Sequence, residues 1–260
     1  MNILEEIIAH KKKEIEKQSA IVTLERLKEA QRVYSIRDFK SAINLNKINI
    51  IAEIKRKSPS EKDIMLNANP VNIAVSYEEN GAAAISVLTD EKYFGGSLDF
   101  IKKVKDAVRL PVLRKDFIIS EYQVWESFYY GADAILLIAD AIDYELLGRL
   151  YSLATDLGLH VLIESHSLEN IKSIVKLNPD IVGINCRDLK TMKTNINWFK
   201  KVFDKLPMDA VKVAESGIGS VQDVEFVSSI GYNSILVGTS LMKMESEGGS
   251  MVRILNRVSV

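Results

Sequence analysis

Cysteine is nearly absent from the sequence, and histidine is scarce. The one cysteine, Cys186, cannot form an internal disulfide, and the three histidines are scattered without the spacing of a zinc site. These absences favour a reducing, cytoplasmic setting and argue against a structural metal.

Neither sign of charge is in excess. Lysine and arginine number 34 against 35 aspartates and glutamates, so no overall positive field attracts nucleic acid or anionic lipid. No apolar run reaches the roughly 18 residues of a membrane span, and the first residues mix acids with apolar side chains, unlike a secretion signal. We therefore expect a small-molecule substrate, no nucleic-acid or membrane partner, and a monomer or weak homodimer.

What the sequence does contain, from about residue 48 onward, is a series of short runs rich in Ile, Val and Leu. Such continuous runs suit parallel strands that are covered on both faces. Eight runs are centred near residues 51, 85, 112, 135, 161, 182, 212 and 235, with helical patterns between them. Eight βα units predict an α/β fold, a (β/α)₈ TIM barrel over residues 48–260. A doubly wound open sheet is the alternative, although the glycine-rich turn of its dinucleotide-binding form is absent after the first strand.

The first 47 residues predict a helical extension packed on the barrel. Apolar residues at 3, 4, 7, 8 and 15 form an amphipathic stripe, and residues 34–43 predict a second short helix. Lys11, Lys12 and Lys13 are surrounded by glutamates, so we interpret them as a solvated helical face rather than a nucleic-acid patch.

Ionisable residues follow the predicted strands. In a barrel of this kind the active site lies at the carboxyl ends of the strands. The candidates there are Glu53, Lys55, Lys115, Glu164 and Glu215. A single buried ion is as readily a structural salt bridge, but five at strand ends favour proton-transfer chemistry. We expect neighbouring lysines and glutamates there to have pKa values shifted toward neutrality.

Side-chain alternation along the first strand gives a more local prediction. Glu53 and Lys55 share a face with Ile51, so both ions should point into the barrel mouth, while Ala52 and Ile54 face the helices.

The last two strands end in small residues, within AESGI (214–218) and LVGTS (236–240). Barrels often bind phosphate after strands 7 and 8 through backbone amides and a short helix. The alternative is that these glycines only turn the chain. Lys55 and Lys57 would add positive charge for an anion.

Taken in order, several motifs resemble those of indole-3-glycerol phosphate synthase. They are IIAEIKRKSPS, VLTDEKYFGGSLDFI, PVLRKDFII, GADAILLI, VLIESH, IVGINCRDL, VAESGI and LVGTSLM. The resemblance implies a carbon–carbon lyase (carboxy-lyase) of tryptophan biosynthesis. It would convert 1-(2-carboxyphenylamino)-1-deoxyribulose 5-phosphate into indole-3-glycerol phosphate, carbon dioxide and water, without a cofactor or metal.

The resemblance also implies roles for individual residues. Lys115 would be the general acid at the substrate carbonyl, and Glu164 the general base that assists dehydration. Lys55 would hold the substrate carboxylate and can share the acid's role, while Glu53 would orient the lysines and the substrate hydroxyls. The other substrate contacts implied are Asn185, Glu215 and Ser216 at the sugar, Arg187 near the anion sites, Gly217, Gly238 and Thr239 at the phosphate, Phe94 and Phe117 at the aromatic ring, and Ser58.

The sequence departs from the family at the turn after Ser-Pro-Ser, where Lys-Gly is common. Here the turn reads SPSEKD, so we expect the loop after the first strand to differ in flexibility or closure. Cys186 follows Asn185, and alternation turns its thiol away from the barrel interior, as expected for a buried bystander.

Two other functions compete with this interpretation. A phosphoribosylanthranilate isomerase-like barrel would use an Asp with a Cys, and no cysteine ends an early strand here. A non-catalytic phosphate-ligand-binding barrel would have no need of Lys115 and Glu164, and both are present.

Overall fold

Eight parallel strands close into a barrel in the computed structural model, which describes residues 3–59, 62–188, 192–243 and 249–256. Around the barrel the strand order is β1-β10-β9-β8-β7-β6-β5-β4, and β1 pairs with both β10 and β4. The strands are β1 (Asn49–Ile54), β4 (Ala84–Leu88), β5 (Val112–Lys115), β6 (Ala134–Ile138), β7 (His160–Ser165), β8 (Ile181–Asn185), β9 (Val211–Glu215) and β10 (Ser234–Val237). Each predicted strand is confirmed. The fold is the predicted TIM barrel and not the doubly wound open sheet.

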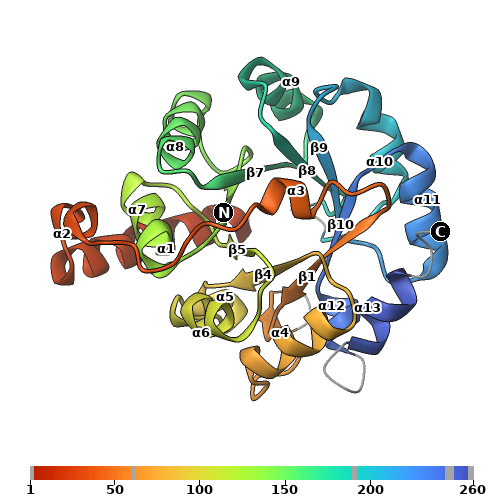
Figure 1. Ribbon diagram of the computed structural model, residues 1–260. Coiled ribbons are helices and arrows are strands. Elements are labelled where there is room, and N and C mark those ends of the chain that lie inside the picture. The colour runs from red at the N-terminus through yellow and green to blue at the C-terminus, as the bar shows by residue number, and fades with distance from the viewer. Residues whose placement is uncertain (1–2, 60–61, 189–191, 244–248, 257–260) are drawn as a thin grey trace.

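Helices surround the barrel, as Figure 1 shows. The long ones are α4 (Pro70–Glu79), α6 (Asp99–Ala107), α7 (Glu121–Tyr130), α8 (Tyr144–Asp156), α9 (Leu168–Leu177), α11 (Val221–Ile230) and α13 (Gly249–Asn256). Shorter ones are α5 (Glu91–Phe94), α10 (Asn197–Val202) with the 3₁₀ turn η1 (Phe203–Lys205), and α12 (Thr239–Met242). Left-handed residues end several helices, for example Gly131 after α7 and Gly231 after α11, because glycine adopts that conformation without a steric cost.

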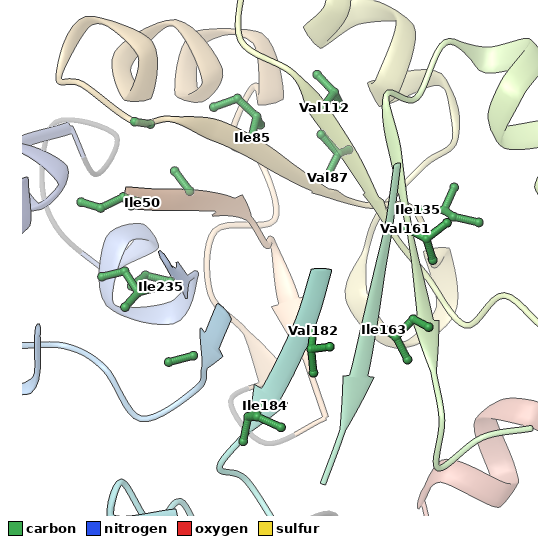
Figure 2. Close-up of a cluster of buried hydrophobic side chains, with 14 of the residues drawn as sticks. Ile50, Ile85, Val87, Val112, Ile135, Val161, Ile163, Val182, Ile184 and Ile235 are labelled. Atoms are coloured by element: carbon green, nitrogen blue, oxygen red, sulfur yellow. The ribbon is translucent and has the colours of Figure 1, made fainter. Parts of the chain in front are cut away.

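The strands are buried on both faces, which explains their continuous apolar sequences. Ile51 packs in the barrel interior, while Ile50, Ala52 and Ile54 belong to the outer core between strands and helices. Figure 2 shows this outer core, in which side chains of neighbouring strands such as Ile135, Val161 and Ile163 lie together. Full burial of one such side chain contributes about 1.5–3 kcal/mol, so this core is the main source of stability.

The extension before the barrel contains α1 (Ile3–Ile21), α2 (Leu24–Glu29) and α3 (Phe39–Ala42). The predicted helix over 34–43 is shorter than expected, because Asp38 caps α3 and starts the helix there. Phe39 and Ile43 are fully buried within the interior core, beside the residues that begin β8 and β9. They therefore close the amino-terminal end of the barrel, where α3 lies in Figure 1.

A buried ion cluster fastens α1 to the barrel. The Lys11 ammonium is only 1% exposed and lies 2.9 Å from Asp90 Oδ2 and 3.0 Å from Asp116 Oδ1. Asp90 caps α5, and Asp116 directly follows β5. The interpretation of all three lysines as a solvated face is therefore wrong for Lys11, although Lys12 and Lys13 are exposed.

The loop after β1 contains a small antiparallel hairpin that the sequence patterns did not indicate. It consists of β2 (Lys57–Ser58) and β3 (Lys62–Asp63). Residues 60 and 61, on which the predicted difference in loop closure depends, lie outside the described residues. Across the described parts of the chain, no helix combines the length and apolar character needed to cross a bilayer.

Candidate active site

A cavity of about 510 Å³ opens at the carboxyl ends of the strands. Every residue to which the resemblance assigns a role lines it. These are Glu53, Lys55, Ser58, Phe94, Lys115, Phe117, Glu164, Asn185, Arg187, Glu215, Ser216, Gly217, Gly238 and Thr239. Lys57 does not line the cavity, contrary to the expectation that it would add charge there, because its ammonium donates to the carbonyl of Lys92 at 3.2 Å.

Lys115 lies between two carboxylates on other strands. Its Nζ is 2.8 Å from Glu164 Oε2 on β7 and 3.5 Å from Glu215 Oε2 on β9. The ammonium of Lys55, directly after β1, lies 2.9 Å from Glu53 Oε1 on that strand, so both ions point into the barrel mouth as predicted. The five strand-end ions therefore form one cluster.

The expectation that these pKa values move toward neutrality is wrong for the central pair. Burial alone would lower the pKa of Lys115, but the charges of Glu164, Glu215 and Glu53 outweigh it and raise that pKa. Burial alone would raise the pKa of Glu164, but Lys115 and His166 outweigh it and lower that pKa to about 2. Close pairing therefore holds Lys115 as a cation and Glu164 as an anion.

The pKa of Glu215 shifts in the opposite direction to that of Glu164. Burial and the neighbouring Glu164 carboxylate raise its pKa well above the usual value, which favours a neutral carboxylic acid. Space for this side chain exists because residue 183 on β8 is glycine, where a Cβ atom would collide with Glu215 Oε1. The site thus holds a carboxylate and a carboxylic acid side by side, with opposite hydrogen-bonding capacities.

Asn185, at the end of β8, connects Glu164 to the loop beyond β8. Its Nδ2 donates to Glu164 Oε1 at 3.1 Å, and its Oδ1 accepts the backbone N–H of Arg187 at 3.0 Å. The Arg187 guanidinium donates to the carbonyl of Met192 at 3.1 Å and lines the cavity, where it can meet an anion.

The ends of β9 and β10 have unusual backbone. Ser216 and Gly217 both adopt left-handed conformations, with φ of 70° and 69°. For a non-glycine residue such as Ser216 this costs on the order of 1 kcal/mol and is typical of functional sites. Gly238 precedes α12, and a Cβ atom there would collide with Glu53 Oε1. The missing Cβ atom at Gly238 therefore leaves room for the Glu53 side chain.

The part of the cavity wall formed by Phe94 and Phe117 is apolar. The rings of Phe94 and Phe117 lie 6.1 Å apart at an angle of 35°, and both line the cavity. Sequence reasoning missed the contribution of α1, whose Ile3, Leu4 and Ile7 also line it. The amphipathic stripe in the sequence predicted only that one face of the helix packs on the barrel. Apolar residues that contact the barrel and apolar residues that line a ligand cavity have the same pattern in the sequence.

His166 is a second omission. It lines the cavity two residues after Glu164, and its Nε2 lies 3.3 Å from Glu164 Oε1. The alternation used for Glu53 and Lys55 would have found it, because residues two apart share a face.

Cys186 is buried and lies outside the barrel interior, as predicted. It belongs to the outer core and its Sγ donates to the carbonyl of Ser216 at 3.3 Å. Burial raises the pKa of its thiol to about 11, so it stays protonated and unreactive. Among the residues that the structure describes, no group of three His, Cys, Asp or Glu side chains could hold a metal ion.

Solved structures of low sequence identity share the barrel. 3-Hexulose-6-phosphate synthase from Salmonella typhimurium superposes with a TM-score of 0.66 at 15% identity, covering 81% of this chain and 98% of that one. Thiamine phosphate pyrophosphorylase from Pyrococcus furiosus gives a TM-score of 0.61 at 16% identity, with coverage of 82% and 95%. At such identities the likeness supports the fold alone.

Sequence relatives are much closer, and the three described next are all indole-3-glycerol phosphate synthases. The Caldanaerobacter subterraneus subsp. tengcongensis protein is 43% identical over 243 residues, covering 94% of each chain. The Geobacillus kaustophilus protein is 44% identical over 255 residues, covering 97% of this chain and 96% of its own. The Bacteroides thetaiotaomicron protein is 41% identical over 258 residues, covering 99% of each. The family model for indole-3-glycerol phosphate synthase matches residues 4–253, and the chain therefore belongs to that family.

Proposed function

We propose that Lys115 and Glu164 are the general acid and base of the reaction of this family, and that the protein needs no metal or cofactor. Family membership makes the chain a carboxy-lyase of tryptophan biosynthesis that produces indole-3-glycerol phosphate. The observation that carries the proposal is the 2.8 Å pair of Lys115 and Glu164 inside the cavity. The pair supplies a proton donor and a proton acceptor at one place.

Ring closure requires that the carbonyl oxygen of the sugar take up a proton as the aromatic ring attacks the carbonyl carbon. Lys115 is held as a cation and can donate that proton. Once the ammonium loses its charge, the main influence that lowers the pKa of Glu164 is gone, so the carboxylate becomes a stronger base. Donation by the lysine therefore prepares the glutamate for the later dehydration step.

The remaining carboxylate and hydroxyl groups of the substrate need partners. We assign Lys55 to the substrate carboxylate, with Glu53 orienting it through their 2.9 Å ion pair. Asn185, Glu215 and Ser216 would bind the sugar hydroxyls, a role supported by their position around Glu164.

The two ends of the substrate would occupy opposite sides of the cavity. The phosphate would lie against Gly217, Gly238 and Thr239, with Arg187 and Ser58 as further substrate contacts. The aromatic ring would lie at the apolar wall of Phe94 and Phe117. Carbon dioxide is lost as the ring closes, and loss of the hydroxyl then restores aromaticity.

Three broader statements belong to the same proposal. The chain divides into an extension over residues 1–47 and a catalytic barrel over 48–260, with the extension packed on the barrel. The protein works in the cytoplasm as a monomer or weak homodimer and binds a small anthranilate-linked sugar phosphate. Light scattering at several protein concentrations tests the assembly state, and a stable higher oligomer would contradict it.

The first experiment follows the indole fluorescence of the product with purified protein in the presence of a chelator. Lys115→Ala should lower kcat by at least about a hundredfold, the usual effect of losing a general acid, while circular dichroism stays unchanged. Lys172→Ala, an exposed lysine of α9, is the matched control and should keep full activity. An unchanged kcat for Lys115→Ala would remove that residue from the mechanism, and activity that depends on added metal would refute the cofactor-free reaction.

The second experiment concerns Glu164→Gln, which keeps the shape but cannot accept a proton. We expect the reaction to stop after ring closure, so that carbon dioxide is released while no indole forms. A wild-type rate of indole formation would mean that another group is the base. Incubation with phosphoribosylanthranilate, with the ketose phosphate product separated by chromatography, tests the isomerase alternative, and binding without turnover would favour the non-catalytic barrel.

A further inference from the structure

Gly183, in the middle of β8, has no part in the mechanism proposed for Lys115 and Glu164. It is not among the described residues that line the cavity. Side-chain alternation nevertheless places it on the inner face of the barrel, because Ile181 belongs to the interior core and Asn185 lines the cavity. Gly183 pairs with Glu164 on β7, and its strand also pairs with β9. It is therefore the inner position between the proposed base and the strand that carries Glu215.

The Glu215 carboxyl group occupies the place that a side chain at position 183 would fill. A Cβ atom on Gly183 would collide with Glu215 Oε1 and would lie 3.3 Å from Glu215 Cδ. The other near atom is Leu162 Cδ1, at 3.2 Å, where a small shift of the leucine relieves the contact. The contact with Oε1 would have to widen to at least 3.0 Å. An alanine at position 183 is therefore incompatible with the observed position of the Glu215 carboxyl group.

The backbone at Gly183 is held more firmly than the Glu215 side chain. The strand β8 is paired with β7 over residues 181–184 and with β9 over residues 181–185, so a shift of Gly183 would disturb the hydrogen bonds of two neighbours. Gly183 has no positive φ, and alanine can adopt its backbone conformation without strain. A variant with alanine there should therefore fold, and the group that moves should be the Glu215 carboxyl.

Little else fixes the position of this carboxyl group. Among the described residues, no backbone amide or hydroxyl donates a hydrogen bond to either oxygen of Glu215. Its Oε2 lies 3.5 Å from Lys115 Nζ, and the neighbouring Glu164 carboxylate disfavours a negative charge on it. The shape of the wall, with no side chain at position 183, therefore determines where Oε1 lies.

We propose that Gly183 is a positioning residue of the reaction, because the absence of a side chain there places the Glu215 carboxyl group beside Lys115 and leaves room for the sugar of the substrate. This inference rests on the proposed role of Glu215 at the sugar hydroxyls. A methyl group at position 183 projects from the wall of the barrel and drives the carboxyl group inward. There the carboxyl takes space that the substrate needs and no longer meets the hydroxyls in the same geometry.

Steady-state kinetics of Gly183→Ala, followed by the fluorescence of the indole product, test the proposal. Misplacing a contact group by about 1 Å can cost about a hundredfold in rate, so we expect kcat/KM to fall at least about tenfold, with a rise in KM. Gly148→Ala is the matched control, because no atom lies within 4 Å of a Cβ atom added at that position of α8. The control should leave kcat and KM unchanged.

Shortening the acid separates positioning from a general effect of the methyl group. Glu215→Asp withdraws the carboxyl group by one methylene toward β9 and away from position 183. In this background the methyl group has nothing to displace. The double variant should therefore keep kcat/KM within about threefold of Glu215→Asp alone, which is the non-additivity expected for residues in contact. Thermal melts check that each variant folds.

Equal losses from Gly183→Ala in the two backgrounds would overturn the proposal, because Gly183 would then act independently of Glu215. An unchanged kcat/KM for Gly183→Ala would overturn it as well. If Gly183→Ala does not fold, the double variant decides: folding with the activity of Glu215→Asp supports the proposal, and a second failure to fold overturns it. Failure of the underlying role is distinguishable, because Glu215→Ala with wild-type kinetics would remove Glu215 itself from substrate binding.

Discussion

Replacing Lys11 by methionine should destabilise the protein strongly, although the residue lies in an exposed-looking run of three lysines. Its ammonium is 1% exposed and contacts Asp90, Asp116 and Glu14, each within 3.0 Å. Methionine has a similar length and removes only the charge. The substitution therefore leaves two buried carboxylates of the barrel with one partner fewer.

The loss falls unequally on the two aspartates. Asp116 keeps the Arg114 guanidinium at 3.1 Å and the Thr89 hydroxyl at 2.6 Å. Asp90 keeps the backbone N–H of Tyr93 on Oδ1, but its Oδ2, fully buried, has no other hydrogen-bond partner in the described chain. Removing one partner of a buried ion pair costs about 3–5 kcal/mol. At about 2–4 °C per kcal/mol for a domain of this size, the Tm should fall by roughly 10 °C.

Urea titration followed by circular dichroism measures this cost, with Lys13→Met as the matched control on the exposed side of the same helix. The control should stay within about 0.5 kcal/mol of the wild type. Adding Asp90→Asn to Lys11→Met removes the uncompensated charge and should recover at least about 1 kcal/mol of the loss. If Lys11→Met and Lys13→Met have the same free energy of unfolding, the ion cluster does not hold the extension on the barrel.

Two other substitutions test the electrostatics of the cavity and its surroundings. Glu215→Gln should raise the free energy of unfolding at pH 7 by at least about 1 kcal/mol, because one unit of pKa difference corresponds to about 1.4 kcal/mol and the pKa of Glu215 is raised on folding. The gain should shrink as the pH falls through about 4.3 and disappear well below it, where the glutamate is protonated in both states. An equal gain at pH 3 in urea titrations would therefore contradict the assigned cause. Cys186→Ser should keep kcat within about twofold in the fluorescence assay, since the thiol faces the outer core, and a large loss at an unchanged Tm would give the cysteine a part in the reaction.

The barrel and most of its site could be predicted because both follow from local rules. Strands covered on both faces must be apolar throughout, so an interruption by an ion stands out. Glu53 is such an interruption in β1 and Lys55 directly follows the strand, and side-chain alternation alone placed both at the mouth. The same rule finds Lys115 and Glu164, because polar groups at strand ends are the ones a barrel can use.

What could not be predicted depends on partners far away in the sequence. Lys11 has glutamates close to it in the chain, and only the fold brings Asp90 and Asp116 to its ammonium. The pKa directions failed for a similar reason. Burial alone would move Lys115 and Glu164 toward neutrality, and the opposite shift arises from a contact of 2.8 Å that no sequence pattern records.

The strong pairing of Lys115 and Glu164 appears unsuited to proton transfer, since it stabilises the ionised forms of both. The difficulty disappears when the two are considered with the substrate present. In the proposed mechanism the carbonyl group of the substrate competes for the ammonium, and proton donation by Lys115 removes the charge that lowers the pKa of Glu164. In the proposed mechanism Glu164 both holds the charge on Lys115 and serves the later dehydration, so any change at Glu164 should affect every step after ring closure.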